Sequence, residues 1–292
     1  MFSFRYPPRS LAELRNDFVR VGLGIAYSLK PKRLSALPYI VVAGLQSLVG
    51  LGRDQAFDTP LPLPASRRGF LGMAPSLDPE SLMHGFRLGY FPFSHVGPKK
   101  WFMHAQRMVI EPHLIKRDKD VKRLLRSGKL RVTFDQRFEE VMRACAEPRK
   151  GQVPLTWITE DIIAAYVKLH ETGDAHSFEA WNEEGELVGG GFGIAVGPVF
   201  VIESQFTKQR NASKVAMVTL LRHLSAWGFA FADGKTHTDY LEAVGFAEIP
   251  HDDYVAVIRR GPDRLGPTGL WNVDPALDAS GDWQPAAQTA AA

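Results

Sequence analysis

The sequence predicts an α/β fold of the α+β type, built on a mixed sheet. Between His176 and Thr207 three runs of β character follow one another, joined by a polar Asn-Glu-Glu-Gly turn and by a Gly-Pro turn at Gly197. Helical patterns precede this hairpin region, and a helix, a strand and a further helix–strand pair follow it. The 292 residues are 45% apolar and 23% charged, which is ordinary for a globular chain able to bury a large core.

Residues 1–66 are expected to form a basic and apolar N-terminal extension that ends in a proline-rich linker. Apolar residues recur at helical spacing from Leu11, and a second apolar run covers Leu37–Leu51. That run is too short and too interrupted by glycine for a transmembrane helix, which needs ~20 residues, and the segment lacks the order of a signal peptide. Residues 1–52 could contact a membrane surface weakly, but packing on the domain, or a loosely held appendage, is the favoured interpretation.

Residues 67–112 are expected to form a small N-terminal module. Pro79 suits the first turn of a helix that Gly89 ends, and Tyr90–Phe93 follows as a loop. Trp101 then stands beside lysines. This composition suits base stacking combined with phosphate contact, although aromatic residues more often belong to a core.

Residues 113–262 are expected to form the main domain, and residues 263–292 a disordered tail. Helices and strands alternate before the hairpin region and again after it. The expected helices cover His113–Ser127, Arg137–Ala146, Glu160–His170, Val215–Trp227 and His237–Val244. The expected strands outside the hairpin region cover Leu130–Phe134, Phe229–Asp233, Phe246–Ile249 and Tyr254–Ile258.

The net charge of +3 is unevenly distributed along the chain. Residues 99–150 carry 15 Lys and Arg against 7 Asp and Glu, whereas residues 151–292 carry 9 against 19. A basic middle segment favours a polyanionic partner, the alternative being a solvated basic face. The single Cys145 excludes an intramolecular disulfide and a cysteine-rich zinc site, so a reducing, cytoplasmic setting is expected.

Carboxylates follow two of the apolar runs. Glu203 comes at the end of the third β run, and Asp233 ends the strand after the next helix, so both are candidates for a cleft. Between them, Asn211 is placed to cap a helix, and the free amides there could take a phosphate together with Lys214. His176 could serve as a catalytic base, but it begins a strand and a structural role is favoured.

This order of elements resembles the GCN5-related acyltransferases, which have an α/β fold with a mixed sheet. The coenzyme A loop of that class carries glycines in a Gln/Arg-x-x-Gly-x-Gly/Ala pattern, and the matching stretch Gln209–Lys214 has none. The resemblance therefore implies an acyl donor other than acyl-CoA.

Ordered pieces between Phe70 and Ile258 carry a second, more specific resemblance. They are Gly89-Tyr90-Phe91-Pro92, Trp101 with Arg107, Thr156-Trp157-Ile158-Thr159, Ala165-Tyr166 with Leu169-His170, Gly173-Asp174-Ala175-His176-Ser177, Leu187-Val188-Gly189-Gly190, Glu203-Ser204, Asn211-Ala212-Ser213-Lys214 and Asp233. With these pieces the chain resembles the bacterial leucyl/phenylalanyl-tRNA–protein transferases. That family moves Leu or Phe from a charged tRNA to the N-terminal Arg or Lys of an acceptor protein, without coenzyme A or a metal. Its fold is a small N-terminal module on a GCN5-like domain, and a monomer is expected.

The resemblance implies roles by position. Glu203 matches the acidic residue of the family near the acceptor amine, and Asp233 matches an aspartate that orients or deprotonates catalytic groups. Together with Lys235, which stands where the family has Gln, they form the expected catalytic group. The expected surroundings of the aminoacyl group and the tRNA 3′ end are Trp101, Trp157, Ile202, Ser204, Gln205 and Phe206. The expected phosphate contacts are Arg107, Lys116, Arg117, Lys122, Arg123, Asn211 and Lys214.

Several residues depart from the family pattern near these positions, among them Phe102, Met103, His104 and Thr207. Ile202 stands in place of Gly, Gln205 in place of Met and Lys235 in place of Gln. Ile202 would narrow an apolar donor pocket and Gln205 would make it polar, whereas Lys235 would supply a charged donor or pair with Asp233. Two alternatives to an active transferase stay open. One is a GCN5-like transferase that uses another, non-CoA donor on an amine or a lipid, and the other is a catalytically silent tRNA-binding relative.

Overall fold

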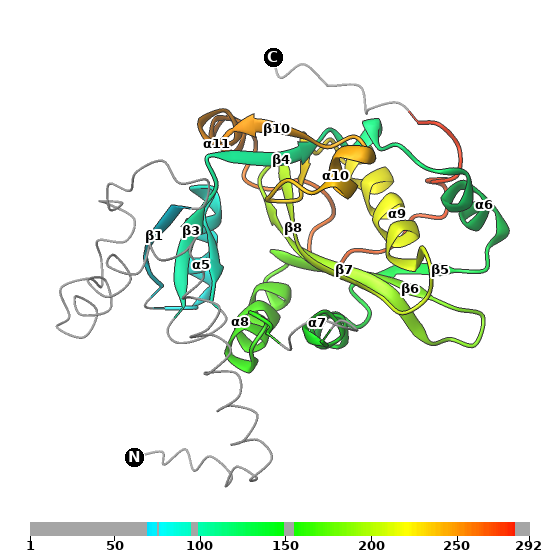
Figure 1. The fold of residues 1–292 in the computed structure, drawn as a ribbon, viewed down its shortest axis with the longest axis horizontal. Coiled ribbons are helices and arrows are strands. Elements are labelled where there is room, and N and C mark those ends of the chain that lie inside the picture. Colours follow the sequence, from blue (N-terminus) through cyan, green and yellow to red (C-terminus); the bar gives the residue numbers. More distant parts are fainter. Residues whose placement is uncertain (1–68, 75, 95–98, 149–154, 284–292) are drawn as a thin grey trace, which may run out of the picture.

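Residues 69–74, 76–94, 99–148 and 155–283 are described by a computed structural model of the chain (Figure 1). They form a three-stranded sheet on one side and a seven-stranded sheet that makes up most of the protein, with helices around both. One pair of neighbouring strands in the larger sheet is parallel and the others are antiparallel. The predicted α/β class with a mixed sheet is therefore confirmed.

The smaller sheet belongs to the first part of the described chain. Its antiparallel order is β1 (Gly69–Met73), β3 (Lys100–Met103), β2 (Phe91–Phe93). Helix α5 (Pro79–Arg87) is capped by Asp78, whose carboxylate accepts a hydrogen bond from the Ser81 amide at 2.9 Å. Its apolar face, with Leu82 and Phe86, points inward.

The larger sheet has the order β10-β4-β9-β8-β7-β6-β5, and β8 and β9 are its parallel pair. Its strands are β4 (Gln106–Ile110), β5 (Arg131–Phe134), β6 (Ala175–Trp181), β7 (Leu187–Val196), β8 (Val199–Thr207), β9 (Phe231–Asp233) and β10 (Ala247–Pro250). The predicted hairpin region corresponds to β6, β7 and β8. Strand β4 lies between β9 and β10, so a strand inside the predicted N-terminal module is built into the sheet of the main domain.

Helices cover both faces of the larger sheet (Figure 1). One face packs against α7 (Phe138–Ala146) and α8 (Glu160–Glu171), and the other against α9 (Ala212–Ala226). Strand β7 and α9 approach so closely that a Cβ on Gly189 would lie 2.6 Å from the Cβ of Ala212. The remaining helices are α6 (Lys119–Ser127), α10 (Asp239–Ala243) and α11 (His251–Arg260), with a 3-10 turn η1 (Pro112–Leu114) before α6.

Three predicted elements differ from the structure. Residues Tyr254–Ile258 belong to helix α11 and not to a strand, because their buried side chains recur at helical spacing. The expected loop Tyr90–Phe93 contains β2. The helix expected from His113 begins at Lys119, where Asp118 caps it by accepting from the Val121 amide at 2.8 Å.

Residues 263–283, called the C-terminal segment below, pack on the main domain although the sequence predicts disorder there. Trp271 is buried, and Ala279 and Trp283 join the core beneath α9. Large aromatic side chains supply the apolar area that holds this irregular segment in place. Residues 284–292 lie outside the described residues, as does the N-terminal extension with its expected membrane contact. No helix in the described part of the chain has the length and apolar character that crossing a membrane requires.

Candidate active site

Strands β8 and β9 separate at the point where the predicted acidic residues lie. Their parallel pairing ends at Val201 and Asp233, and among the described strands only β7 pairs with β8 beyond it. Glu203 is an extra residue in the β7–β8 ladder, because Ile202 and Ser204 pair with consecutive residues of β7. Such a bulge redirects a side chain. Here it directs Glu203 toward α8, away from the regular ladder.

The Glu203 carboxylate has partners on one oxygen only. Its Oε2 accepts hydrogen bonds from Lys235 Nζ at 3.0 Å and from the Tyr166 hydroxyl at 3.3 Å. Its Oε1 is buried and has no hydrogen-bond partner among the described residues. Burial and the Glu203 charge raise the pKa of Tyr166, so this phenol remains a donor. The unpaired oxygen is the acceptor that an incoming N–H group would need.

Lys235 lies beside Glu203 in a strained backbone conformation. Its φ is +66°, in the left-handed region that residues other than glycine rarely occupy outside turns and functional sites. Its Nζ also donates to the Glu203 carbonyl at 3.1 Å and lies 5.4 Å from the ring centre of Trp157. The ammonium group therefore pairs with Glu203 and not with Asp233. Lys235 contacts Asp233 through its backbone amide, which donates to Oδ1 at 2.7 Å.

Asp233 pairs with a buried arginine that reaches it from the neighbouring strand β4. Arg107 donates from Nη2 to Asp233 and from Nη1 to the Gly89 carbonyl at 3.1 Å, and its side chain is 1% exposed. Burial lowers the pKa of this guanidinium, but Asp233, together with Tyr254 and Glu203, more than offsets the effect and the pKa is raised. The predicted phosphate contact of Arg107 is therefore not possible in this arrangement, because no phosphate can reach the group.

The two tryptophans expected at the tRNA 3′ end lie in different surroundings. Trp157, in the loop before α8, is partly exposed and packs near Phe93 and Tyr166 at the Glu203 site. Trp101 is 0% exposed, and a Cβ on Gly85 would lie 2.5 Å from its ring. Trp157 remains a candidate for base stacking, whereas Trp101 offers no open ring face.

The β8 residues expected around the donor divide between the two faces of the sheet. Ile202 is buried in the core beneath α9, and Gln205 Nε2 lies 3.4 Å from Met217 Sδ of α9. Phe206 packs in the core on the α8 side, and Ser204 is partly exposed beside Glu203. Ile202 and Gln205 therefore lie on the face opposite to Glu203: Ile202 by the ordinary alternation of a strand, and Gln205 because the bulge at Glu203 reverses that alternation.

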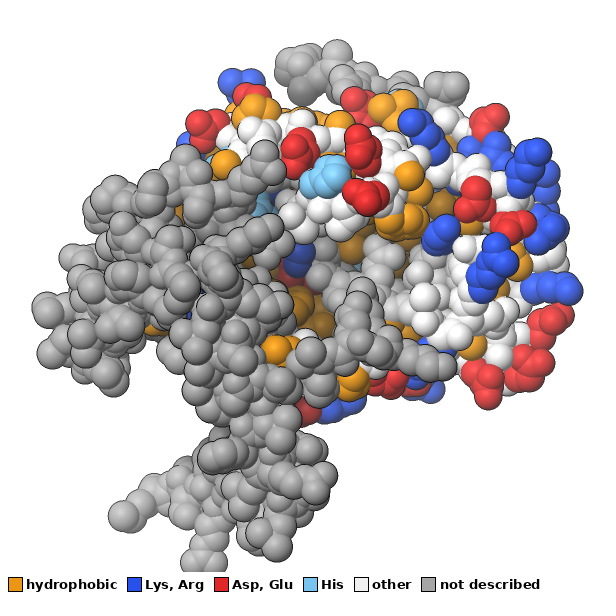
Figure 2. Space-filling model, viewed as in Figure 1, with side chains coloured by type: hydrophobic (Ala, Val, Ile, Leu, Met, Phe, Trp, Pro, Cys, Tyr) orange, Lys and Arg blue, Asp and Glu red, His pale blue; other side chains and the backbone are white. Residues whose placement is uncertain are grey.

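The other expected phosphate contacts lie around α6 and the start of α9. Lys and Arg side chains gather at this end of the molecule in Figure 2, and Lys116 and Arg123 are exposed. Some of their charge is neutralised locally, since Arg123 pairs with Asp120 at 2.9 Å and Lys214 with Asp118 at 3.4 Å.

Two further residues of this set behave differently from expectation. Asn211 occupies the cap position of α9 with φ +65°, but its side chain makes no capping hydrogen bond. The Arg117 side chain is only 8% exposed because the C-terminal segment covers it, while Lys122 is 37% exposed.

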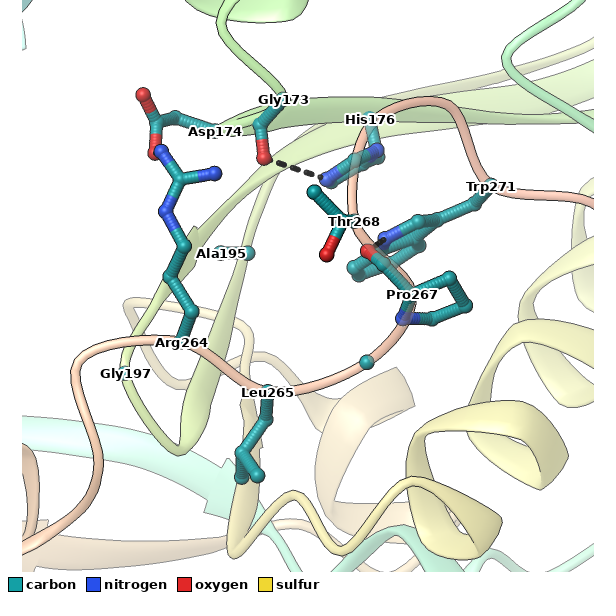
Figure 3. Close-up of a pocket in the computed structure, with 11 residues that line it drawn as sticks. Gly173, Asp174, His176, Ala195, Gly197, Arg264, Leu265, Pro267, Thr268 and Trp271 are labelled. Atoms are coloured by element: carbon teal, nitrogen blue, oxygen red, sulfur yellow. Dashed lines mark hydrogen bonds and ion pairs between the residues drawn. The ribbon is translucent and has the colours of Figure 1, made fainter.

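A second polar cluster lies on the α9 face of the sheet, beside a small pocket (Figure 3). His176 stacks on Trp271, with the ring centres 3.6 Å apart, and its Nδ1 lies 2.7 Å from Asp135 Oδ2. Its Nε2 is 3.2 Å from the Gly173 carbonyl, and the Trp271 amide donates to Asp135 at 2.7 Å. Every polar atom of His176 is engaged, which supports the structural role favoured from the sequence.

Sequence reasoning missed two residues of the Glu203 site. Tyr166 faces inward from α8 and Tyr254 from α11, and the Tyr254 hydroxyl lies 3.5 Å from Arg107 Nη2. The inward spacing of apolar residues on α8 was a usable signal for Tyr166, but α11 was expected to be a strand. No group of three or more His, Cys, Asp or Glu within the described ranges has the arrangement of a metal site.

Comparisons with known proteins identify the family of this chain. The family described as leucyl/phenylalanyl-tRNA protein transferase matches residues 109–259. A leucyl/phenylalanyl-tRNA–protein transferase of Chromobacterium violaceum is 38% identical over 205 residues, which cover 70% of this chain and 87% of the relative. Relatives of the same name from Pseudomonas fluorescens, 41% identical, and Anaeromyxobacter sp., 37% identical, are covered to 89% and 94% by matches that span 70% and 77% of this chain. The chain belongs to the leucyl/phenylalanyl-tRNA–protein transferase family.

Proposed function

We propose that this chain transfers an amino acid from an aminoacyl-tRNA to the N-terminus of an acceptor protein. Family membership supports the reaction class, and the names of the relatives refer to leucyl- and phenylalanyl-tRNA and to a protein. The observation that carries the proposal is the buried Glu203 carboxylate, with one oxygen held by Lys235 and Tyr166 and the other unpaired. Leu or Phe is the proposed donor, and Arg or Lys the proposed N-terminal residue of the acceptor.

The reaction forms one bond and breaks one. The acceptor α-amine attacks the ester carbonyl of the aminoacyl-tRNA, a C–N bond forms, and the C–O bond to the terminal ribose breaks. One amine proton leaves the nitrogen, and the ribose oxygen departs as a hydroxyl with a proton. Glu203 Oε1 is proposed to accept this proton from the amine nitrogen and to pass it on. An α-amine with a pKa near ~8 is partly neutral at pH 7, so a modest base is enough.

Lys235 and Asp233 are proposed to hold this carboxylate in position. Two donors on Oε2 and the Lys235 contact with the Glu203 carbonyl fix the rotamer of Glu203, while Asp233 fixes the backbone that carries Lys235. An aminoacyl ester is already activated, so positioning of the two reactants would supply most of the rate. Trp157 stands beside Lys235 and is proposed to stack on the 3′ adenosine.

The surface around α6 is proposed to meet the phosphates of the tRNA. Its exposed basic residues are Lys116, Lys119, Arg123, Arg126 and Lys129. Binding through such contacts weakens steeply as salt rises, since each neutralised phosphate releases counterions. An affinity that does not change between low and moderate salt would contradict this assignment.

A catalytically silent relative is the second candidate, and one observation favours it. The Lys235 ammonium occupies the carboxylate oxygen that an acceptor amine could otherwise approach. The first candidate predicts turnover in spite of this contact, because Oε1 has no partner among the described residues, and it requires the buried carboxylate to become accessible when the substrates bind.

An in vitro transfer assay separates the candidates. The chain is mixed with tRNA charged with each labelled amino acid in turn, and with acceptor peptides that differ only in their N-terminal residue. We expect Leu or Phe to be joined to peptides that begin with Arg or Lys. Transfer of another amino acid would replace the proposed donor, and tRNA binding without any transfer would establish the silent relative.

A further inference from the structure

The C-terminal segment places a tryptophan against two arginines. Arg117 Cζ lies 4.3 Å from the centre of the Trp283 ring, and Arg222 Cζ lies 5.7 Å from it. Arg117 comes from the loop before α6, and Arg222 comes from α9. Two guanidinium groups from separate elements thus form a slot, called the arginine slot below, that holds one aromatic ring.

The same segment supplies polar acceptors to Arg117. Its Nη1 donates to the carbonyls of Ala279, at 2.9 Å, and of Gly281, while Nη2 donates to Asp282 Oδ1 at 2.7 Å. Asp282 also lies 3.9 Å from Lys122 Nζ, and its side chain is 87% exposed. A carboxylate therefore sits where a phosphate would meet Arg117 and Lys122.

The contact between the C-terminal segment and the arginine slot leaves some buried N–H donors without a hydrogen bond to any described residue. Arg117 Nε, Arg222 Nε and Trp283 Nε1 are buried and have no hydrogen-bond acceptor within the part of the chain that the structure describes. Buried donors without partners weaken the contact that contains them. An ion pair through the exposed Asp282 is also screened by salt. A ligand with more acceptors could therefore displace the segment.

We infer that the arginine slot binds an unpaired nucleotide of the tRNA and that Asp282 and Trp283 occupy it in the free protein. Arginine side chains stack on nucleobases and pair with phosphates, so a ring beside a carboxylate imitates a base beside its phosphate. The slot adjoins α6, whose exposed basic residues would continue the contact along the RNA. The inference rests on the proposed function, because it takes tRNA as the ligand.

The test compares tRNA binding by the full chain with binding by its Asp282→Asn and Trp283→Ala variants. Uncharged leucine tRNA is titrated at several salt concentrations. Each substitution should free Arg117 to contact the RNA. Binding of the tRNA should then tighten about three- to tenfold near 0.1 M salt, and the number of counterions released on binding should rise by roughly one. Adding Arg117→Ala to either variant should remove the gain. Asp263→Asn, in the same segment but away from the slot, is the charge-matched control and should change nothing.

Amide hydrogen exchange, measured alongside the titration, reports directly whether tRNA displaces the C-terminal segment. Amide exchange at residues 279–283 should speed up when tRNA binds to the unaltered chain, whereas a purely structural cap would keep its protection. Because Trp283 is part of a core, Trp283→Ala could unfold, and Asp282→Asn then decides the question. Unchanged affinity and salt dependence in Asp282→Asn, with transfer intact, would overturn the slot but not the proposed function. Failure of every variant and of the unaltered chain to bind or transfer would overturn both.

Discussion

Two buried glutamates of the same sheet make opposite use of burial. Glu179 on β6 has both carboxylate oxygens in use: Oε1 accepts from Ser177 Oγ at 2.6 Å and from the Arg137 amide at 3.3 Å, and Oε2 accepts from Thr133 Oγ1 at 2.5 Å. Glu203 on β8 has one oxygen held and the other unpaired. Burial alone therefore does not distinguish the two carboxylates, whereas the unused acceptor at a bulge does.

The surroundings of the two residues reinforce this distinction. Glu179 lies in a regular ladder opposite Thr133, and burial raises its pKa despite the hydroxyl donors. Glu203 lies in a bulge, next to a lysine in the left-handed region and at the point where two parallel strands separate. Strain and unmet hydrogen bonds concentrate at Glu203, and that is where function is expected.

Exchanging the two carboxylates for amides should give the largest effects and separate the two roles. Glu203→Gln should lower kcat/KM for transfer about 10²- to 10⁴-fold, because Oε1 would lose its capacity to take a proton. Glu179→Gln, the matched control, should leave transfer per folded molecule unchanged and lower the free energy of unfolding by about 1–2 kcal/mol, because one hydroxyl would face a donor. Transfer assays and urea unfolding measure both. Normal transfer by Glu203→Gln would remove Glu203 from the reaction.

The lysine beside Glu203 offers a smaller and sharper test. Lys235→Gln keeps a hydrogen-bond donor near Oε2, whereas Lys235→Met leaves a buried carboxylate with Tyr166 alone. A hydrogen bond to a charged group contributes about 1.5–3 kcal/mol, so Lys235→Met should slow transfer roughly ten- to a hundredfold. Lys235→Gln should stay within about threefold of the unaltered chain or exceed it, since Gln is the residue that the family pattern has there. Equal losses in both variants would show that the positive charge itself is required.

Features encoded locally were predictable from the sequence, and features that depend on long-range contacts were not. The fold class, the three hairpin strands and the positions of Glu203 and Asp233 follow from local patterns, because apolar alternation and its interruption are encoded over a few residues. The Arg107–Asp233 pair joins strands that are 126 positions apart, so it depends on a sheet order that no local pattern contains. Trp101 could not be separated from Trp157 either, since both stand between a polar and an apolar neighbour and only packing buries one of them fully.

The C-terminal segment was missed for a related reason. Its two buried tryptophans, Trp271 and Trp283, belong to no helical or strand repeat of apolar residues, and turn-forming residues lie between them. Disordered tails share this composition. What holds it is contact with residues far away in the sequence, such as Asp135, which accepts from the Trp271 amide. A segment of this kind is recognised only when the surface that receives it is known.

A buried histidine should make the free energy of unfolding depend on pH, which is the smallest of the expected effects. His223 on α9 is as fully satisfied as Glu179: its Nδ1 lies 2.7 Å from the Thr219 carbonyl, and its Nε2 accepts from the Asp274 amide at 2.8 Å. Burial lowers the pKa of His223 below 6.5, so the folded state keeps the ring neutral. The stability that it contributes is therefore complete above pH 6.5 and is lost as the pH falls through the lower folded-state value.

Protonation would place an N–H of His223 against the Asp274 amide and loosen the C-terminal segment. We expect the free energy of unfolding to fall below pH 6.5 by up to about 1.4 kcal/mol per pH unit for this group. His223→Gln keeps a donor and an acceptor but does not titrate, so it should flatten that slope. Part of the slope should remain, because burial and Arg107 also lower the pKa of His251. If stability falls with pH as steeply in His223→Gln as in the unaltered chain, this contact does not anchor the segment. If the slope is flatter in His223→Gln, and the Asp274 amide exchanges more slowly in that variant than in the unaltered chain at acid pH, the contact does anchor it.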